Sequence, residues 1–418
     1  MKPKRGEASG LTKSNSTAGV LRYAHPYFTP VKPEARSSRM LDHIQGTLHP
    51  IPPLKRNNGQ WSLDEIIGKD GVDAITASGR ITIHVTGDTG VPENDHETRQ
   101  VMVTDQMAKD YNANQKSGLN PAFFLHLGDV IYGQSATAYL DQFYRPNMHY
   151  PGKIIAIPGN HDGETDAKMQ DFQTYFCATS PEIPPLANSI YRQTMNQPGV
   201  YWCLDAPFVQ IVGLYSNSAE NPGFIAGTQI GNQQKDWLTA TLKALKQQRD
   251  QRKPRKALLF ATHHPPFSSG GHSGSAGMLT DIDEVCREAG IMPDAFFSGH
   301  AHSIQYYTRT VKLGAQKLQI PFVVSGCGGH GDQKVAPPAS NGHVDHSYDY
   351  GYQGWGYTKV DVTATTLTIT SYGVDWNSVT ELRSVSLDLA SGQLQSGQSR
   401  FRPAGIPQFG EGLAVPSL

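Results

Sequence analysis

The stretch Ile81-Thr82-Ile83-His84-Val85-Thr86-Gly87-Asp88-Thr89-Gly90 joins an alternating strand pattern to a turn bounded by glycines. Apolar residues at every second position from Ile81 to Val85 predict a β-strand. Gly87 and Gly90 then predict a tight turn that carries the carboxylate of Asp88. Taken alone, such a turn is common, because an aspartate in a turn often bonds nearby backbone N–H groups. Its meaning therefore depends on what recurs elsewhere in the chain.

Four further apolar runs end in the same way, in a turn that carries Asp, Asn or His. The expected strands cover residues 122–127, 153–157, 257–261 and 294–297. The polar residues that follow them are Asp129 and Tyr132, Asn160 and His161, His263 and His264, and His300 and His302. Because ligands bind beyond the carboxyl ends of strands in α/β sheets, we expect these side chains to converge in space.

The five turns together supply carboxylate, phenol, amide and imidazole groups, and no thiolate. Such oxygen and nitrogen ligands suit iron, manganese and zinc, and they disfavour copper(I) and iron–sulfur clusters. There are too many of them for one tetrahedral zinc ion. The set fits two ions of higher coordination that share a bridging carboxylate and together clamp a phosphate during in-line displacement. Each turn is a weak signal by itself, but five in this order predict a dinuclear metal site.

The five motifs resemble the signature of the calcineurin-like metallophosphoesterases. They are Gly87-Asp88-Thr89-Gly90, Gly128-Asp129-Val130-Ile131-Tyr132, Gly159-Asn160-His161-Asp162, Thr262-His263 and Gly299-His300-Ala301-His302. Most of these enzymes carry Asp-x-His in the first motif, whereas Gly90 takes the histidine position here. Together with Tyr132, this feature is similar to the purple acid phosphatases, most of all the small mammalian-type enzymes, over residues 81–372.

The resemblance implies which residues bind the two ions. Seven residues stand at metal-ligand positions of the family: Asp88, Asp129, Tyr132, Asn160, His263, His300 and His302. In the family, the counterparts of Asp88, Tyr132 and His302 hold an Fe(III) ion, and its bond to tyrosinate gives the purple colour. The counterparts of Asn160, His263 and His300 hold a divalent ion, expected here to be Fe, Zn or Mn. The counterpart of Asp129 bridges the two.

The resemblance also implies roles for the histidines that are not ligands. His161 and His272 match family histidines that contact the substrate phosphate, and His161 would also assist the leaving group. His264 occupies a variable position and is expected to be an outer or structural residue. No separate organic cofactor is expected.

The function implied by the family is hydrolysis of phosphate monoesters of a small phosphorylated substrate by a metal-bound hydroxide. One alternative within the enzymes is a phosphodiesterase or nucleotide pyrophosphatase with the same metal site. The alternative from another class is a non-catalytic member that binds a partner. Such members usually lose ligands, whereas all seven positions are filled here, which favours an acid phosphatase-like hydrolase.

Composition excludes several other classes. A net charge of −1 and a pI near 7.0 leave no basic surface for nucleic acid. No apolar run approaches the ~20 residues of a membrane span, and the N-terminus lacks the apolar segment of a secretory signal. The expected location is therefore the cytoplasm, unless a signal was removed before Met1. The four cysteines form no CxxC pair, which leaves one disulfide open.

The chain is expected to consist of three segments. Residues 1–75, rich in Pro, Ser, Lys and Arg, form an N-terminal extension that is partly irregular, with a short helix near 63–67. Residues 76–390 form the catalytic domain, and 391–418 form a C-terminal tail. The expected fold is α+β, an α/β-like four-layer sandwich in which two packed mixed β-sheets are flanked by helices. Helices are expected at 97–111 and 233–246, and largely antiparallel strands at 322–324, 357–362 and 367–371.

Overall fold

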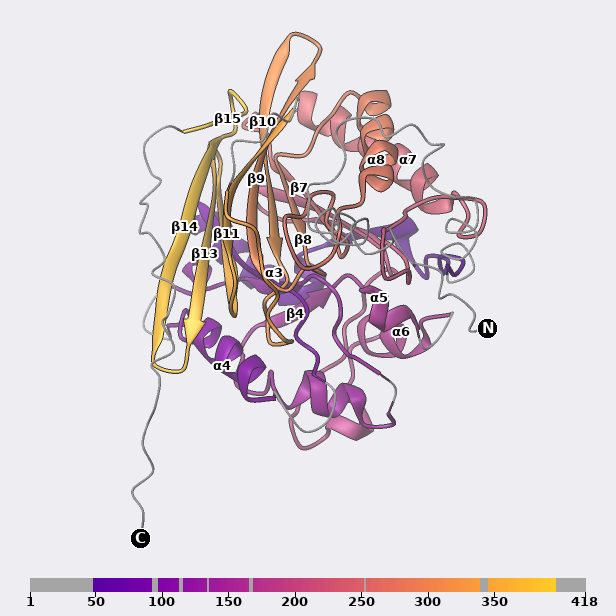
Figure 1. Ribbon diagram of the computed structural model, residues 1–418, viewed down its shortest axis with the longest axis vertical. Coiled ribbons are helices and arrows are strands. Elements are labelled where there is room, and N and C mark those ends of the chain that lie inside the picture. Colours follow the sequence, from indigo (N-terminus) through magenta and orange to yellow (C-terminus); the bar gives the residue numbers. More distant parts are fainter. Residues whose placement is uncertain are drawn as a thin grey trace, which may run out of the picture.

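Two mixed β-sheets, of eight and seven strands, lie at the centre of the protein and carry helices on their outer sides (Figure 1). The computed structural model describes residues 48–91, 97–112, 116–133, 135–164, 168–251, 253–338 and 345–395. The expected α+β sandwich of two mixed sheets flanked by helices is confirmed. The sheets touch through buried side chains, such as the hydroxyls of Tyr306 and Ser371, which lie 2.7 Å apart.

The seven-stranded sheet has the order β15-β14-β13-β12-β2-β3-β4. Strands β2, β3 and β4 run parallel to one another, and the later strands join them in antiparallel fashion. The bounds are β2 Arg80–Thr86, β3 Phe123–His126, β4 Lys153–Ala156, β12 Gly356–Thr363, β13 Thr366–Asp375, β14 Ser378–Asp388 and β15 Gln393–Leu394. Strands β2, β3 and β4 are buried almost throughout because they are covered on both faces.

The eight-stranded sheet has the order β1-β5-β6-β7-β8-β10-β9-β11. Its middle strands β6, β7, β8 and β10 are parallel, and β9 and β10 form an antiparallel hairpin. The bounds are β1 Gln60–Ser62, β5 Trp202–Asp205, β6 Val209–Leu214, β7 Ala257–Thr262, β8 Ala295–Ser298, β9 Ile304–Leu313, β10 Gln316–Ser325 and β11 His346–Tyr352. Both sheets therefore contain a block of parallel strands whose carboxyl ends can form one site.

Helices cover the sheets on their outer sides. The longer ones are α3 Asp64–Ser78, α4 Glu97–Ala108, α7 Gln233–Gln251 and α8 Ala276–Ala289, and the shorter ones are α5 Asn160–Glu164 and α6 Gln170–Phe176. Trp237, Leu238 and Leu242 give α7 a buried face. Figure 1 shows α7 and α8 side by side near β7 and β8, while α4 lies at the far end, by the foot of β13.

Residues 48–75 pack against the core rather than standing apart from it. β1 pairs in parallel with β5, and the helix expected near 63–67 is α3, which begins at Asp64 and ends at Ser78. Residues 1–47 and 396–418 lie outside the described residues. The division of the chain at 75 and 391 stays a prediction.

Within the described ranges, neither a disulfide nor a membrane-spanning helix is present. All four cysteines, Cys177, Cys203, Cys286 and Cys327, are free and buried there, so the disulfide left open by the sequence does not form. None of the described helices is both long enough and apolar enough to cross a bilayer.

Backbone hydrogen bonds connect the residues that follow the parallel strands. Gly87 N–H, just after β2, donates to the carbonyl of Ser325 at the end of β10, over 2.9 Å. Gly299 N–H, after β8, donates to the carbonyl of His263 after β7, over 3.0 Å. The turn after β2 is thus held against the end of β10, and the turn after β8 against the turn after β7.

Removal of the buried carboxylate of Asp294 should strongly destabilise the fold. It pairs with Arg255 at 2.6 Å and Arg249 at 3.1 Å and accepts from the N–H of Leu258 at 2.8 Å. Asp294→Ala removes the carboxylate partner of both guanidinium groups and the acceptor of one buried N–H, so the free energy of unfolding should fall by about 3 kcal/mol. Urea unfolding followed by circular dichroism measures this change.

Acid should remove the same stabilisation. Burial opposes ionisation of Asp294, but Arg249 and Arg255 hold its pKa below the ordinary value. The contribution is therefore complete above the unfolded-state pKa of about 3.9 and is lost as the pH falls below it. The difference in the free energy of unfolding between wild type and Asp294→Ala should therefore become smaller as the pH falls below that value. Asp73→Ala, which removes an exposed ion pair with Lys69, is the control, and an equal effect there would contradict the prediction.

Candidate metal centre

Three of the turns that follow strands hold a residue with left-handed backbone. The φ angles of Asp88, Asp129 and His300 are 55°, 53° and 67°. Side chains other than glycine seldom adopt this region, and such residues cluster where a binding site requires an unusual direction. In each of the three turns, the unusual backbone directs a polar side chain back toward the junction of the two sheets.

One half of the centre forms around Asp88. Its Oδ1 atom lies 3.4 Å from the hydroxyl of Tyr132 and 3.4 Å from Nε2 of His302. The hydroxyl of Tyr132 and Nε2 of His302 are themselves 3.3 Å apart. The Nδ1 atom of His302 lies 2.7 Å from the carbonyl of Gly331, so its proton is donated there and Nε2 presents a lone pair to the group.

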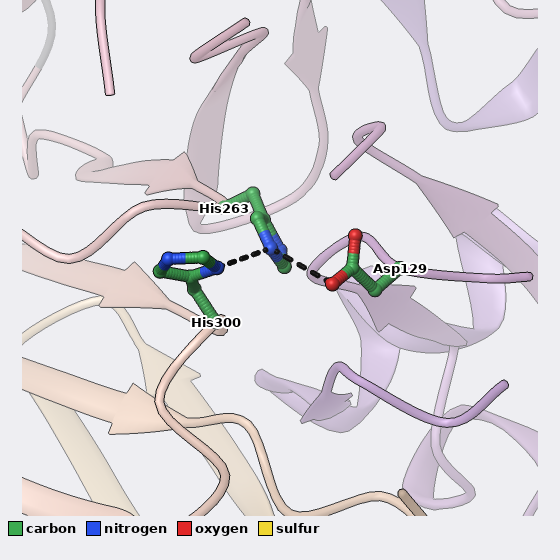
Figure 2. A group of neighbouring side chains, drawn as sticks. All are labelled: Asp129, His263 and His300. Atoms are coloured by element: carbon green, nitrogen blue, oxygen red, sulfur yellow. Dashed lines mark hydrogen bonds and ion pairs between the residues drawn. The ribbon is translucent and has the colours of Figure 1, made fainter. Parts of the chain in front are cut away.

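The other half forms around His263. Its Nε2 atom lies 3.0 Å from Oδ1 of Asn160, 3.1 Å from Nδ1 of His300 and 3.2 Å from Oδ2 of Asp129. Figure 2 shows the rings of His263 and His300 and the carboxylate of Asp129 turned toward one another. These three residues are buried, and their ligand atoms are close enough to share one metal ion.

In this half, the lone pairs of several nitrogen and oxygen atoms face one another, which favours a cation between them. His263 Nδ1 lies 2.8 Å from the carbonyl of Leu127, so the ring donates there and Nε2 carries a lone pair. That lone pair faces the oxygens of Asn160 and Asp129, and Asp129 Oδ2 has no hydrogen-bond partner among the described residues. Burial lowers the pKa of His263, but Asp129 and Asp88 outweigh it and raise that pKa to about 9, so Nε2 keeps its lone pair only where a metal ion takes the place of the proton. A cation between these atoms satisfies all of them.

The glycines of the motifs leave room for the carboxylates. A Cβ atom at Gly159 would lie 2.0 Å from Oδ1 of Asp129. At Gly299 and Gly326 it would lie 2.5 Å and 2.7 Å from Oδ2 of Asp88. Any side chain at these positions would displace the carboxylates. Only glycine therefore fits at these positions without moving Asp88 or Asp129.

The two remaining histidines border this group on its open side. His161 donates its backbone N–H to Oδ1 of Asp129 over 3.0 Å, and its ring centre lies 4.4 Å from that of Tyr132. The ring of His272 lies 4.0 Å from that of His300, with Nδ1 3.2 Å from Glu220. Both predicted catalytic histidines therefore lie beside the predicted ligands.

The family follows from this pattern of motifs together with a direct match. Residues 81–303, more than half of the chain, match the model of the calcineurin-like phosphoesterases. This chain belongs to the calcineurin-like phosphoesterase family. Members of the superfamily bind a dinuclear metal centre, and the buried Asp and His group described above agrees with metal-dependent phosphoester hydrolysis.

Solved structures of other phosphoesterase-fold proteins are similar to this one at low sequence identity. A purple acid phosphatase from yellow lupin seeds has a TM-score of 0.53 and 15% identity, over 74% of this chain and 54% of that one. GAP50, the anchor in the inner membrane complex of Plasmodium, has a TM-score of 0.51 and 10% identity, over 72% and 88%. The chain thus spans about half of the lupin protein, and both likenesses concern the fold alone. No curated protein sequence matches the chain.

The first phosphoesterase motif has a local reason to lack a histidine. A Cβ atom at Gly90 would lie 2.7 Å from the carbonyl oxygen of Val130 and 2.9 Å from Oε1 of Gln142. Gln142 accepts from the N–H of Tyr132 at 2.8 Å and donates to its carbonyl at 2.9 Å. The space that a side chain at position 90 would need is therefore used to hold Tyr132.

His264 lies behind the phosphoesterase site and takes part in packing. It is fully buried, with Nδ1 2.8 Å from the hydroxyl of Ser216 and Nε2 2.8 Å from the carbonyl of Ala219. Burial, followed by the charge of His263, lowers its pKa to about 3, so it is neutral. These contacts agree with the structural place expected from the sequence.

The sequence did not point to several residues that contact the predicted ligands, among them His330 and Glu220. His330 stacks on Tyr132 with ring centres 3.8 Å apart and planes within 7°, and its Nδ1 lies 2.9 Å from the carbonyl of Gly90. Its glycine-rich turn follows β10, so the rule of polar turns after strands applies to it as well. Glu220 accepts from Nδ2 of Asn160 over 3.3 Å. It comes from a long loop and has no motif that could have marked it.

Proposed function

We propose that this phosphoesterase hydrolyses phosphate monoesters at two metal ions, in the manner of a purple acid phosphatase. The observation that carries the proposal is the group formed by Asp88, Tyr132 and His302, whose ligand atoms lie 3.3–3.4 Å apart. A phenol in that place, opposite a glycine in the first motif, is the feature that separates purple acid phosphatases from most of their relatives.

The residues present fit two ions. Asp88, Tyr132 and His302 would hold an Fe(III) ion; Asn160, His263 and His300 would hold a divalent ion; and Asp129 would bridge them. Burial, then Asp129 and Asp88, raise the pKa of the Tyr132 phenol well above its ordinary value. A tyrosinate here therefore requires a strong positive charge beside it, which favours a trivalent ion. When bound, the ions would supply charge for the phosphate oxygens and lower the pKa of water.

In this proposal His161 acts on the leaving group. Burial alone would lower its pKa, but Glu164, 2.9 Å from Nδ1, and the charge of Asp129 raise it to about 9. The contact with Glu164 favours the protonated ring, which could give a proton to a departing alkoxide. His272, fixed by Glu220 on the other side of the opening, would contact the phosphate and orient it.

Metal removal tests the proposed function. The purified protein should contain about two metal ions per chain, including iron, and should hydrolyse 4-nitrophenyl phosphate. Prolonged dialysis against a chelator should abolish this activity, and adding back iron with a divalent ion should restore it. Metal analysis by mass spectrometry and release of 4-nitrophenolate measure the two quantities together.

The same assay separates the monoesterase from its closest rival. Bis(4-nitrophenyl) phosphate offers the same leaving group in a diester, so the ratio of kcat/KM for the two compounds reports the preference directly. A ratio of at least about tenfold in favour of the monoester is expected. Faster hydrolysis of the diester would replace the proposal with a phosphodiesterase, and a metal-loaded protein inactive on both would refute hydrolysis.

A further inference from the structure

An arginine and a tryptophan lie together next to the Tyr132 side of the centre. Trp355 stands just before β12, and its indole N–H donates to the carbonyl of His330 over 3.0 Å. The guanidinium carbon of Arg99, in the first turns of α4, lies 4.2 Å from the centre of the Trp355 ring. Because His330 stacks on Tyr132, the pair adjoins the proposed Fe(III) half of the site.

Both members of the pair are fixed to the framework of the site. The carbonyl of Trp355 accepts from Val374 N–H over 2.8 Å, and the next residue, Gly356, donates to Cys327 over 2.9 Å. Gln100, which follows Arg99, is buried, and its side-chain amide Nε2 donates to the carbonyl of Gln142 over 2.9 Å. Gln142 in turn holds both backbone groups of Tyr132. Two sets of contacts therefore fix Arg99 relative to the centre. One runs through Trp355, and the other runs through Gln100 and Gln142 to Tyr132.

Arg99 carries a positive charge over the ring of Trp355. Within the part of the chain that the structure describes, no carboxylate pairs with it, and both Arg99 and Trp355 are partly exposed. The carboxylates at the opening, Glu164 and Glu220, lie instead against His161 and His272. A guanidinium held over an indole ring by cation–π attraction can still donate N–H bonds to a phosphate or carboxylate.

We propose that Arg99, supported by Trp355, binds a second anionic group of the substrate. The preferred substrates are then phosphate esters whose alcohol part carries a further phosphate or carboxylate, and the scissile phosphate lies at the two ions. This inference rests on the proposed phosphohydrolase function and narrows its substrate class. It gives a specific role to a cation that the metal chemistry does not use.

The test compares two esters that differ only in the second anion. Kinetics with fructose 1,6-bisphosphate and fructose 6-phosphate give a ratio of kcat/KM values, in which any partial loss of active protein cancels. Wild type should favour the bisphosphate, and Arg99→Gln should lower the ratio on the order of tenfold, the size of one charge-assisted contact. Arg99→Lys should keep part of it, because the charge remains but the planar fork is lost.

A matched control and a binding measurement make the outcomes distinct. Arg145→Gln removes another arginine, exposed and paired with Asp141, and should leave the ratio at the wild-type value. An unchanged ratio in Arg99→Gln would overturn the second-anion site while leaving the hydrolase intact. Only inactivity toward 4-nitrophenyl phosphate as well as toward both fructose esters would mean that the proposed function fails. Calorimetric titration with fructose 1,6-bisphosphate then still tests Arg99, because equal affinity for wild type and Arg99→Gln would refute it.

Discussion

Asp129→Asn should lose both metal ions and nearly all turnover. Asp129 is the proposed bridging ligand, its Oδ2 atom faces Nε2 of His263 at 3.2 Å, and it is almost completely buried. The amide keeps the size of the carboxylate but not its charge, so the attraction for two cations falls sharply. We expect kcat/KM for 4-nitrophenyl phosphate to fall on the order of a thousandfold or more, which corresponds to several kcal/mol at the transition state.

The control for this variant is another aspartate changed in the same way. Asp141→Asn alters an exposed carboxylate that pairs with Arg145, and it should keep wild-type metal content and activity. Metal content and circular dichroism should be measured on the same samples, so that loss of fold and loss of ions are separated. An Asp129→Asn protein that is folded and turns over at the wild-type rate would refute the two-metal site.

Tyr132→Phe should remove the visible colour of the protein completely. A purple acid phosphatase absorbs visible light because tyrosinate donates charge to Fe(III), and phenylalanine has no oxygen with which to do so. Tyr132 is the phenol whose oxygen lies beside Asp88 and His302, at 3.4 Å and 3.3 Å. The iron-loaded wild type should therefore show a broad visible band, and the variant should show none. Absorption spectroscopy at equal iron content measures the change.

Another buried tyrosine provides the comparison. Tyr139 is buried, and its hydroxyl has no hydrogen-bond partner among the described residues, yet it belongs to the aromatic cluster of Tyr175 and Phe143 rather than to the ligand group. Tyr139→Phe should keep the band unchanged. A visible band that survives in Tyr132→Phe would exclude the Fe(III)–tyrosinate assignment and leave a metallophosphoesterase of another metal composition.

Much of the fold and the convergence of the site could be predicted from sequence because both depend on local patterns. The apolar runs that end at Gly87, Gly128 and Gly299 are short, bounded by glycine and followed by a polar residue. Parallel strands place their carboxyl ends at one edge, so these polar residues meet once the strands pair. The five motifs therefore contained the site, although they are spread over more than 200 residues.

The residues around the ligands could not be predicted in the same way. Whether Glu220 reaches Asn160, or Trp355 reaches Arg99, depends on how loops cross the edge of both sheets, and no periodic pattern encodes that path. The ring orientation of His263 is another example, because it depends on the carbonyl of Leu127, 136 positions away in the chain. Such contacts are decided by tertiary packing and become visible only in three dimensions.

The left-handed backbone at Asp88, Asp129 and His300 also has an evolutionary consequence. Glycine would adopt these angles without cost, whereas a side chain costs about 1 kcal/mol at each position. Selection for stability alone would therefore replace all three residues by glycine. Their presence agrees with the proposed ligand roles, which glycine, having no side chain, could not fill. A lineage released from selection for those roles should lose these three positions first, long before the strands that carry them begin to change.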